Sequence, residues 1–229
     1  MEKKKIGMLV AIAGEMAAVL RKFGEPGQTH TFPGYQVLTY ENETYTLYVL
    51  SCGAGEVAAA AGVQLLISLF HVELMVNFGV VGGLTQEMGQ EKLCVVKDVV
   101  YYQFDTSEWD HIEPARYLPY PTVYIPTDPE LVARVLELHP ELKAVTCASG
   151  DRFVGNEADK TELHEKYGAE ICEMEAAAVV IICHKNNVPC LLMKAVSDGL
   201  SDGVDDFLGS LQKVAATCLD LTDRIIQEL

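Results

Sequence analysis

The sequence predicts an α/β protein built as a three-layer sandwich, with a mixed central β-sheet between layers of helices. Short runs that are apolar throughout, typical of strands covered on both faces, lie at 6–12, 74–79 and 188–196. Segments with apolar residues at helical spacing lie between the strands, as expected where helices cover a sheet. The 229 residues contain no internal repeat, low-complexity tract or Pro/Gly/Ser-rich linker, so we expect one domain over residues 1–229.

The N-terminal segment is interpreted as a strand, although it resembles a signal peptide. Three lysines precede an apolar run that ends in an Ala-x-Ala pattern at 11–13. That run is at the short limit for a signal peptide, and Glu15 follows it within a helical pattern. The elements expected in this half are a strand at 6–12, a helix at 15–23, a hairpin of strands at 34–40 and 44–52, a helix at 54–70 and a strand at 74–79.

The C-terminal half is predicted to continue this alternation after one long loop. The elements expected there are a strand at 93–102, a helix at 131–138, a strand at 144–148, a helix at 174–184, a strand at 188–196 and a helix from 207 onward. The loop at 103–127 is longer than most loops in compact domains, and such loops are usually functional or disordered. Its aromatic side chains favour a binding role: Phe104, Trp109, Tyr117 and Tyr120.

The charge balance excludes several classes of partner. Lysine and arginine total 17 against 33 acidic residues, which gives a net charge of −16. Such a surface repels phosphate backbones and anionic membrane surfaces, so neither a nucleic acid nor a membrane is expected as a partner. No stretch approaches the ~20 apolar residues of a membrane span. We therefore expect a small-molecule partner.

The seven cysteines are predicted to be buried free thiols of a cytoplasmic protein. Their number is odd, most lie in apolar runs, and no C-x-x-C occurs. Disulfides are rare in reducing compartments. The six histidines are scattered without zinc-ligand spacing, so no metal site is expected. The cysteines are Cys52, Cys94, Cys147, Cys172, Cys183, Cys190 and Cys218.

Two acidic residues follow predicted strands, at the edge where open parallel sheets bind ligands. Glu15 follows the first strand by three residues, and Gly14 before it allows a close backbone approach. Asp198 follows the strand at 188–196 by two residues. A carboxyl at such a buried position can have a raised pKa and act as a general acid. The ordinary alternatives are a solvated first-turn residue for Glu15 and a turn or cap for Asp198.

Two further acids, Glu173 and Glu175, lie where the helix at 174–184 is predicted to begin. Acids in a first turn stabilise the helix macrodipole by ~0.3–1 kcal/mol, which would be reason enough for both. The helix is apolar on all sides through Cys183, however, and this pattern predicts that it is buried along its length. A buried carboxylate at its start needs a strong partner, and a ligand can be that partner.

Five motifs together resemble the purine/uridine phosphorylase superfamily, and within it the 5′-methylthioadenosine/S-adenosylhomocysteine nucleosidases. They extend over nearly the whole chain, and the last two, ~23 residues apart, form the most specific signal. The resemblance implies a nucleoside phosphorylase-like fold and a homodimer. The motifs are I-G-M-L-V-A at 6–11 with Glu15, N-F-G-V-V-G-G-L at 77–84, A-S-G-D-R-F-V at 148–154, C-E-M-E-A at 172–176 and K-A-V-S-D at 194–198.

The resemblance implies hydrolysis of the N-glycosidic bond between adenine and a 5′-thio-substituted ribose, without a cofactor. By the family's pattern, Asp198 protonates adenine N7 and Glu15 activates the attacking water. Departure of adenine leaves an oxocarbenium-like sugar, so an acid at the base and a carboxylate near the ring both stabilise developing charge. Met174 and Glu175 are implied to hold the ribose hydroxyls. Phe153 and Val154 are implied to flank the base and to hydrogen-bond it through the backbone, and Ser197 to steady Asp198. The full set of implied substrate-binding residues is Gly82, Phe153, Val154, Glu173, Met174, Glu175 and Ser197.

This chain departs from the family pattern at Val80, where serine is common, and at Lys194, where arginine is common. Loss of the serine removes a polar contact near the water and the ribose. Phosphorylases bind phosphate with arginines and a serine, and Asn77, Val80 and Glu15 stand at those places here, which favours a hydrolase. The alternatives are a hydrolase or phosphorylase of another nucleoside, with the loop at 103–127 shaping its 5′ pocket, and a non-catalytic nucleoside-binding protein.

Overall fold

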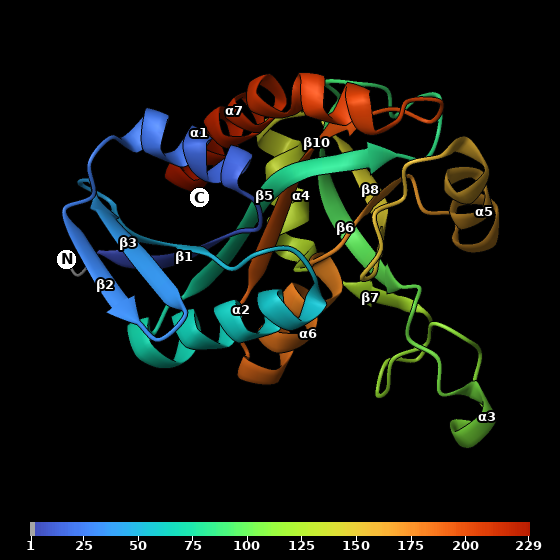
Figure 1. Cartoon of the computed structure of the whole chain (residues 1–229). Helices are drawn as coiled ribbons and strands as arrows, with labels where there is room; N and C mark the ends of the chain where they lie inside the picture. The colour runs from blue at the N-terminus through green and yellow to red at the C-terminus, as the bar shows by residue number, and fades with distance from the viewer. Residues whose placement is uncertain (1–2) are drawn as a thin grey trace.

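The computed structural model describes residues 3–229 as one mixed β-sheet with helices on both faces (Figure 1). This arrangement confirms the predicted α/β architecture. The strands are β1 (Lys4–Val10), β2 (Gln28–Phe32), β3 (Tyr35–Glu41), β4 (Tyr45–Ser51), β5 (Leu74–Gly83), β6 (Leu93–Tyr101), β7 (Tyr124–Pro126), β8 (Lys143–Ser149), β9 (Ile171–Glu173) and β10 (Cys190–Asp198). The helices are α1 (Ala13–Phe23), α2 (Glu56–Phe70), α3 (Ser107–Asp110), α4 (Pro129–Leu138), α5 (Glu157–Tyr167), α6 (Ala176–Asn186) and α7 (Val204–Glu228).

The central strands run parallel and bring their carboxyl ends to one edge of the sheet. β1 lies between β4 and β5, and β10 pairs with β5, all in parallel. β6 is antiparallel to β10 and parallel to β8, and β9 links β8 back to β5. Five strands therefore close into a ring, where the sequence suggested an open sheet. The ring closes because β5 is long enough to pair with β10 along most of its length and with β9 at its last two glycines.

A β-bulge shapes the end of β10. Val196 pairs with Val81 and Asp198 pairs with Gly82, so Ser197 is the extra residue between the two pairs. Bulges re-aim side chains and are frequent beside active sites. This bulge sets Ser197 and Asp198 at the edge of the sheet where the parallel neighbour β5 also ends.

Two apolar clusters pack the helices on the sheet. One joins the sheet to α1, α4 and α7, and the other joins it to α2 and α6. In Figure 1, α1 and α7 lie together on one face and α2 and α6 on the other. Residues 176–181 and Cys183 of α6 are buried, which confirms the burial that the sequence predicts for this helix.

The structure shifts several boundaries, two of them at the ends of β10 and α6, and adds five elements to the sequence prediction. β10 ends at Asp198 rather than two residues before it, and α6 begins after Glu175 rather than at 174. The added elements α3, β7 and β9 have four residues or fewer, too short for a periodic pattern. β2 is a five-residue strand with little buried surface. α5 carries charged residues on every side and therefore has no apolar stripe.

The loop predicted at 103–127 contains α3 and ends in β7. Its rings pack largely on one another, with the ring centroids of Phe104 and Tyr117 4.8 Å apart. Tyr120 Oη lies 2.6 Å from Nδ1 of His184 on α6. The loop reaches out from the body of the molecule at α3 (Figure 1), and Trp109 in α3 is 85% exposed.

All seven cysteines are free, and six of them are buried, as predicted. Within residues 3–229, no helix combines the length and the apolar character needed to cross a membrane.

Candidate active site

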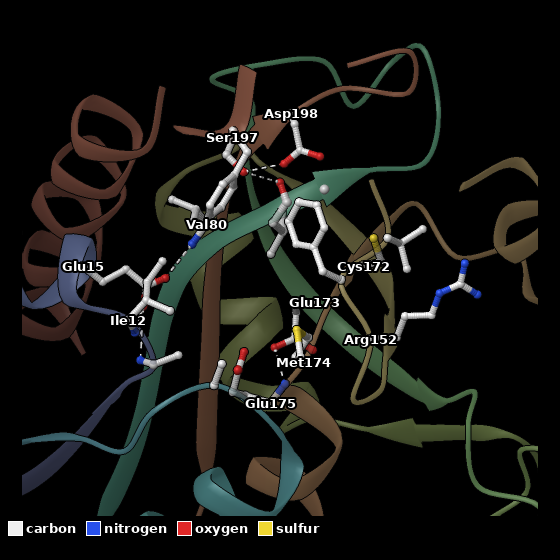
Figure 2. Close-up of a pocket in the computed structure, with 17 residues that line it drawn as sticks. Ile12, Glu15, Val80, Arg152, Cys172, Glu173, Met174, Glu175, Ser197 and Asp198 are labelled. Carbon is white, nitrogen blue, oxygen red and sulfur yellow. Dashed lines mark hydrogen bonds between the residues drawn. The ribbon is translucent and has the colours of Figure 1, made fainter. Parts of the chain in front are cut away.

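A cavity of about 190 Å³ lies at the edge of the sheet where β1, β5 and β10 end. Figure 2 shows carboxylates around it from three sides, with Glu15 on α1, Asp198 on β10 and Glu175 before α6. Both predicted catalytic acids therefore line one cavity. The predicted binding residues all line it as well: Gly82, Phe153, Val154, Glu173, Met174, Glu175 and Ser197.

Three backbone amides hold the carboxylate of Glu15. Ala11 and Ile12, which connect β1 to α1, each donate to Oε2 at 3.1 Å, and Val80 on β5 donates to Oε1 at 2.9 Å. A side chain at position 79 would displace the Glu15 carboxylate, because a Cβ there would lie 2.5 Å from Oε1. Burial raises the pKa of Glu15, while the three amide hydrogen bonds lower it. The result is a buried carboxyl with a fixed orientation toward the cavity.

The carboxyl of Asp198 has a different partner on each oxygen. Ser197 Oγ lies 2.7 Å from Oδ1, and Lys160 Nζ lies 2.7 Å from Oδ2. Burial raises the pKa of Asp198, and the hydrogen bonds from Lys160 and Ser197 lower it. Asp198 itself is 1% exposed and lines the cavity.

Glu175 is the residue that precedes α6, and its carboxylate joins α6 to α2. Oε1 accepts a hydrogen bond of 2.8 Å from the amide of Gly55, the residue that precedes α2. Burial and the nearby charge of Glu173 raise the pKa of Glu175 to about 7, and Lys194 opposes that rise. Near neutral pH, Glu175 therefore changes between a carboxylate and a neutral acid.

Glu173 also lies at the start of α6, and other groups of the protein hold its carboxylate. Its carboxylate accepts hydrogen bonds from the amides of Glu175 at 3.1 Å and Ala176 at 2.9 Å. It also forms a salt bridge of 3.2 Å with Lys194 Nζ, which donates to Asn77 Oδ1 at 2.6 Å. Glu173 therefore caps the start of α6 and also lines the cavity, and its ligand-binding role stays a prediction. Lys194 is 2% exposed, and its charge also lowers the pKa of Glu15 and of Glu175.

A further buried acid, Glu56, was not predicted from the sequence. It lies in the first turn of α2, where a solvated glutamate is common, but it is 4% exposed. Ser149 Oγ and the amide of Ala178 donate to its two oxygens, each at 2.6 Å. Burial and the charge of Glu173 raise the pKa of Glu56 to about 8.

The remaining walls of the cavity are apolar and suit a flat ring. Phe153 and Phe207 meet edge to face, with centroids 5.5 Å apart, and Val154 and Met174 complete this side. Phe207 comes from the first turn of α7, and no motif in the sequence marks it. Arg152 also lines the cavity, but its guanidinium is paired with Asp159.

Two expectations from the sequence concern the loop at 103–127 and the binding of a metal ion. The residues that line the cavity include none from the loop at 103–127, so the loop does not shape this cavity within one chain. Within residues 3–229, no group of three or more His, Cys, Asp or Glu side chains is arranged to hold a metal ion.

Known proteins share both the sequence pattern and the fold. The sequence model of the Phosphorylase superfamily matches residues 5–227. The chain is 29% identical to the aminodeoxyfutalosine nucleosidase of Helicobacter pylori over 99% of both chains. It is 28% identical to the 5′-methylthioadenosine/S-adenosylhomocysteine nucleosidase of Haemophilus ducreyi, over 86% of this chain and 85% of that protein. A crystal structure of a 5′-methylthioadenosine/S-adenosylhomocysteine nucleosidase from H. pylori matches this chain with a TM-score of 0.92, at 27% identity over the full length of both chains. The ligand in that structure is an amino-pyrrolopyrimidine bearing a thioether pyrrolidinol.

Proposed function

Because this chain belongs to the phosphorylase superfamily, we propose that it hydrolyses the N-glycosidic bond of 5′-methylthioadenosine and S-adenosylhomocysteine. The products are adenine and the 5-thio-substituted ribose. One observation carries the proposal: a buried acid at the end of β10 and a buried carboxylate at the start of α1 line the same small cavity. Relatives with nucleosidase activity in their names support it.

Asp198 is the general acid of the proposed reaction. Its raised pKa keeps a proton available at a pH where an exposed aspartate has lost it. Transfer of that proton to N7 of adenine makes the base a neutral leaving group. Ser197, 2.7 Å from Oδ1, holds the carboxyl in place while the proton leaves.

Glu15 is the base that orients and deprotonates the attacking water. The amides of Ala11, Ile12 and Val80 fix its carboxylate and leave it facing the cavity. The negative charge also stabilises the oxocarbenium character of the ribose as the bond to adenine breaks. Catalysis then needs Glu15 ionised and Asp198 protonated at the same time, which predicts a bell-shaped pH profile.

The nucleoside is held between polar and apolar walls. Glu175 has one oxygen on Gly55, and its second oxygen accepts from the ribose hydroxyls. Met174 packs beside the ribose, and Phe153 and Val154 enclose the base. The edge-to-face pair of Phe153 with Phe207 closes this end of the cavity.

Water rather than phosphate is the proposed nucleophile. Four carboxyl groups line the cavity, on Glu15, Glu173, Glu175 and Asp198, and those that are ionised would repel a phosphate ion. Of the lining residues, all within the described chain, Arg152 alone is cationic, and it is already paired with an aspartate.

Aminodeoxyfutalosine is the second candidate substrate. The observation that favours it is the 29% identity to a nucleosidase named for that compound, against 28% for the thioether nucleosidase. The two candidates differ in the nucleoside and leave the proposed roles of the two acids unchanged. Val80, whose amide contacts Glu15, is the residue in the cavity where this chain departs from the family pattern. The activities on the two candidate substrates should therefore be compared for variants at this position.

We also propose that the protein is a cytoplasmic homodimer. Free cysteines accord with a reducing compartment. A large aromatic side chain such as Trp109, 85% exposed on a projecting loop, accords with a contact between subunits. Light scattering of the purified protein tests the dimer, and a monomer at micromolar concentration would contradict it.

The test of the reaction is a panel of nucleosides followed by chromatography of the free base. The panel contains 5′-methylthioadenosine, S-adenosylhomocysteine, aminodeoxyfutalosine, adenosine and inosine, each with and without phosphate. Adenine release from the thioethers without phosphate supports the proposal, and selective cleavage of aminodeoxyfutalosine supports the second candidate. Release only with phosphate indicates a phosphorylase, and thermal stabilisation by a nucleoside without cleavage indicates a binding protein.

A matched pair of variants ties any activity to the cavity. Glu15→Gln should reduce base release by about 10²–10⁴-fold, because the amide is not a base. Glu43→Gln makes the same chemical change at an exposed position before the amino end of β4, away from the cavity, and should leave activity unchanged.

A further inference from the structure

Lys160 is a buried cation on α5 that contacts the proposed general acid. Its side chain is 0% exposed, and Nζ lies 2.7 Å from Asp198 Oδ2. Its other two contacts are the carbonyl oxygens of Gly199 at 2.6 Å and Asp202 at 3.3 Å. An ammonium group has three N–H donors and no acceptor, so these three oxygens satisfy it fully.

The partners of Asp198 distinguish its two oxygens. Oδ2 accepts from the Lys160 ammonium, which can only donate. Oδ1 lies 2.7 Å from Ser197 Oγ, and that hydroxyl also lies 3.1 Å from the carbonyl oxygen of Val81. A hydroxyl has one proton, so Ser197 can donate to Val81 while the neutral acid carries its proton on Oδ1, and to Oδ1 once that proton has left. Oδ2 stays occupied by the ammonium in both states. In the neutral acid the proton therefore belongs on Oδ1.

Gly82 makes room for this contact on β5. A Cβ at this position would lie 3.3 Å from Asp198 Oδ2, 3.6 Å from Lys160 Cε and 3.1 Å from Cys172 Sγ. The glycine that the sequence analysis placed in the binding site thus borders the ion pair. A side chain there would press on the acid and on its lysine at once.

On the basis of the proposed hydrolase function, we propose that Lys160 is a positioning residue for acid catalysis. It fixes the Asp198 carboxyl so that Oδ1 donates the proton, and it stabilises the carboxylate that remains. The proton moves from Oδ1 to N7 of adenine as the N-glycosidic bond breaks and its electron pair leaves with the base. Lys160 keeps its own protons throughout. The charge of Asp198 appears only as the proton leaves, so the ion pair is stronger in the transition state than before it.

The charges around Asp198 set the direction of the expected change. Burial raises its pKa, Lys160 and Ser197 lower it, and the carboxylate of Asp202 raises it. Cys172 on β9 faces the same pair, but burial raises the pKa of its thiol to about 12, so it remains neutral. Removal of the ammonium raises the pKa of Asp198 and makes it a weaker acid. The alkaline limb of the rate profile then moves to higher pH, and the plateau falls.

The test compares a neutral variant, Lys160→Met, with a charged one, Lys160→Arg, on two leaving groups. One substrate is 5′-methylthioadenosine, and the other is 5-methylthioribose with 4-nitrophenolate in place of adenine, which leaves without a proton. We expect Lys160→Met to lower kcat/KM for the adenine substrate by about 10–100-fold, with little change for the nitrophenyl substrate. Lys160→Arg should restore most of the rate and the original alkaline limb.

Equal losses on both substrates would show a merely structural role and overturn the proposal, as would an unmoved alkaline limb. A titration of ¹³C-labelled aspartate carboxyls by NMR, with Asp198→Asn to assign the signal, follows the pair without any substrate. The Asp198 signal should titrate at higher pH in Lys160→Met, and Lys160→Gln serves as a second neutral variant if the methionine variant does not fold. A wild-type protein that releases no adenine contradicts the proposed function. An unchanged Asp198 titration contradicts the role of Lys160.

Discussion

The backbone amide of Val80 donates to Oε1 of Glu15 at 2.9 Å, so residue 80 is tied directly to the carboxylate proposed to activate water. The side chain of Val80 lines the cavity beside that contact, where a serine is common in the family that the sequence resembles. The backbone contact does not depend on the side chain. A change at this position therefore alters the polarity of the cavity while the orientation of Glu15 is kept.

Val80→Ser should raise kcat for 5′-methylthioadenosine several-fold, because the hydroxyl restores a polar contact near the water and the ribose. Loss of the two methyl groups should cost about 1 kcal/mol in the free energy of unfolding. Val80→Ala is the control, since it also reduces the volume but adds no hydroxyl. Steady-state rates decide the matter: equal kcat in the serine and alanine variants would remove the hydroxyl from the explanation.

Asp198→Asn should abolish acid catalysis and also destabilise the fold. The amide has no acidic proton, so adenine release should fall by about 10²–10⁴-fold. It also leaves Lys160, which is 0% exposed, without a counter-charge, and breaking a buried pair in this way costs about 3 kcal/mol or more. Urea unfolding measures this loss.

The double variant Lys160→Met with Asp198→Asn completes the cycle for that pair. It removes the stranded charge and should recover a large part of the lost stability without recovering activity. A double variant less stable than both single variants would show that the two side chains do not act as a pair.

The affinity for the nucleoside should depend on pH through Glu175. Its pKa is about 7, and its carboxylate is proposed to accept from the ribose hydroxyls. As the pH falls from 8 to 6 the group gains a proton, so KM for 5′-methylthioadenosine should rise. Glu175→Gln should raise KM at every pH and remove most of that dependence. A variant that keeps the wild-type pH profile of KM would assign the titration to another group.

The sequence could predict the fold and both proposed catalytic acids because local patterns carry them. The strands predicted at 6–12 and 188–196 are followed closely by acidic residues, and parallel neighbours bring such strand ends to one edge. The position of Asp198 on the strand rather than beyond it depends on the bulge at Ser197, which only strand pairing reveals.

Lys160 and Glu56 could not be predicted, because each looks like a solvated residue in its own segment. Lys160 belongs to a polar helix, and its burial comes from a contact with Asp198, 38 residues away. Glu56 lies in a first turn, and its partner Ser149 is 93 residues away. The environment of a charged side chain in these cases is set by tertiary packing, which leaves no periodic signal in the chain.

The high pKa of Glu56 implies a specific loss of stability as the pH rises. The folded protein holds this proton up to about pH 8, whereas a glutamate in the unfolded chain loses it near the ordinary value of 4.5. Between these two values the unfolded chain binds fewer protons, so the free energy of unfolding falls as the pH rises, by at most about 1.4 kcal/mol per pH unit for this group. Glu175 acts in the same direction up to about pH 7.

Glu56→Gln should therefore stabilise the protein at pH 8 and flatten its stability between pH 5 and 8. A glutamine matches the neutral acid, with its oxygen on the Ala178 amide and its nitrogen toward Ser149 Oγ. Urea unfolding of the wild type and the variant at pH 5.5 and pH 8 measures the difference. Glu130→Gln, in the exposed first turn of α4, is the matched control and should keep the wild-type slope. If Glu56→Gln also keeps the wild-type dependence of stability on pH, Glu56 loses its proton in the folded protein well below pH 8. Burial beside Glu173 would then not raise the pKa of Glu56 as proposed.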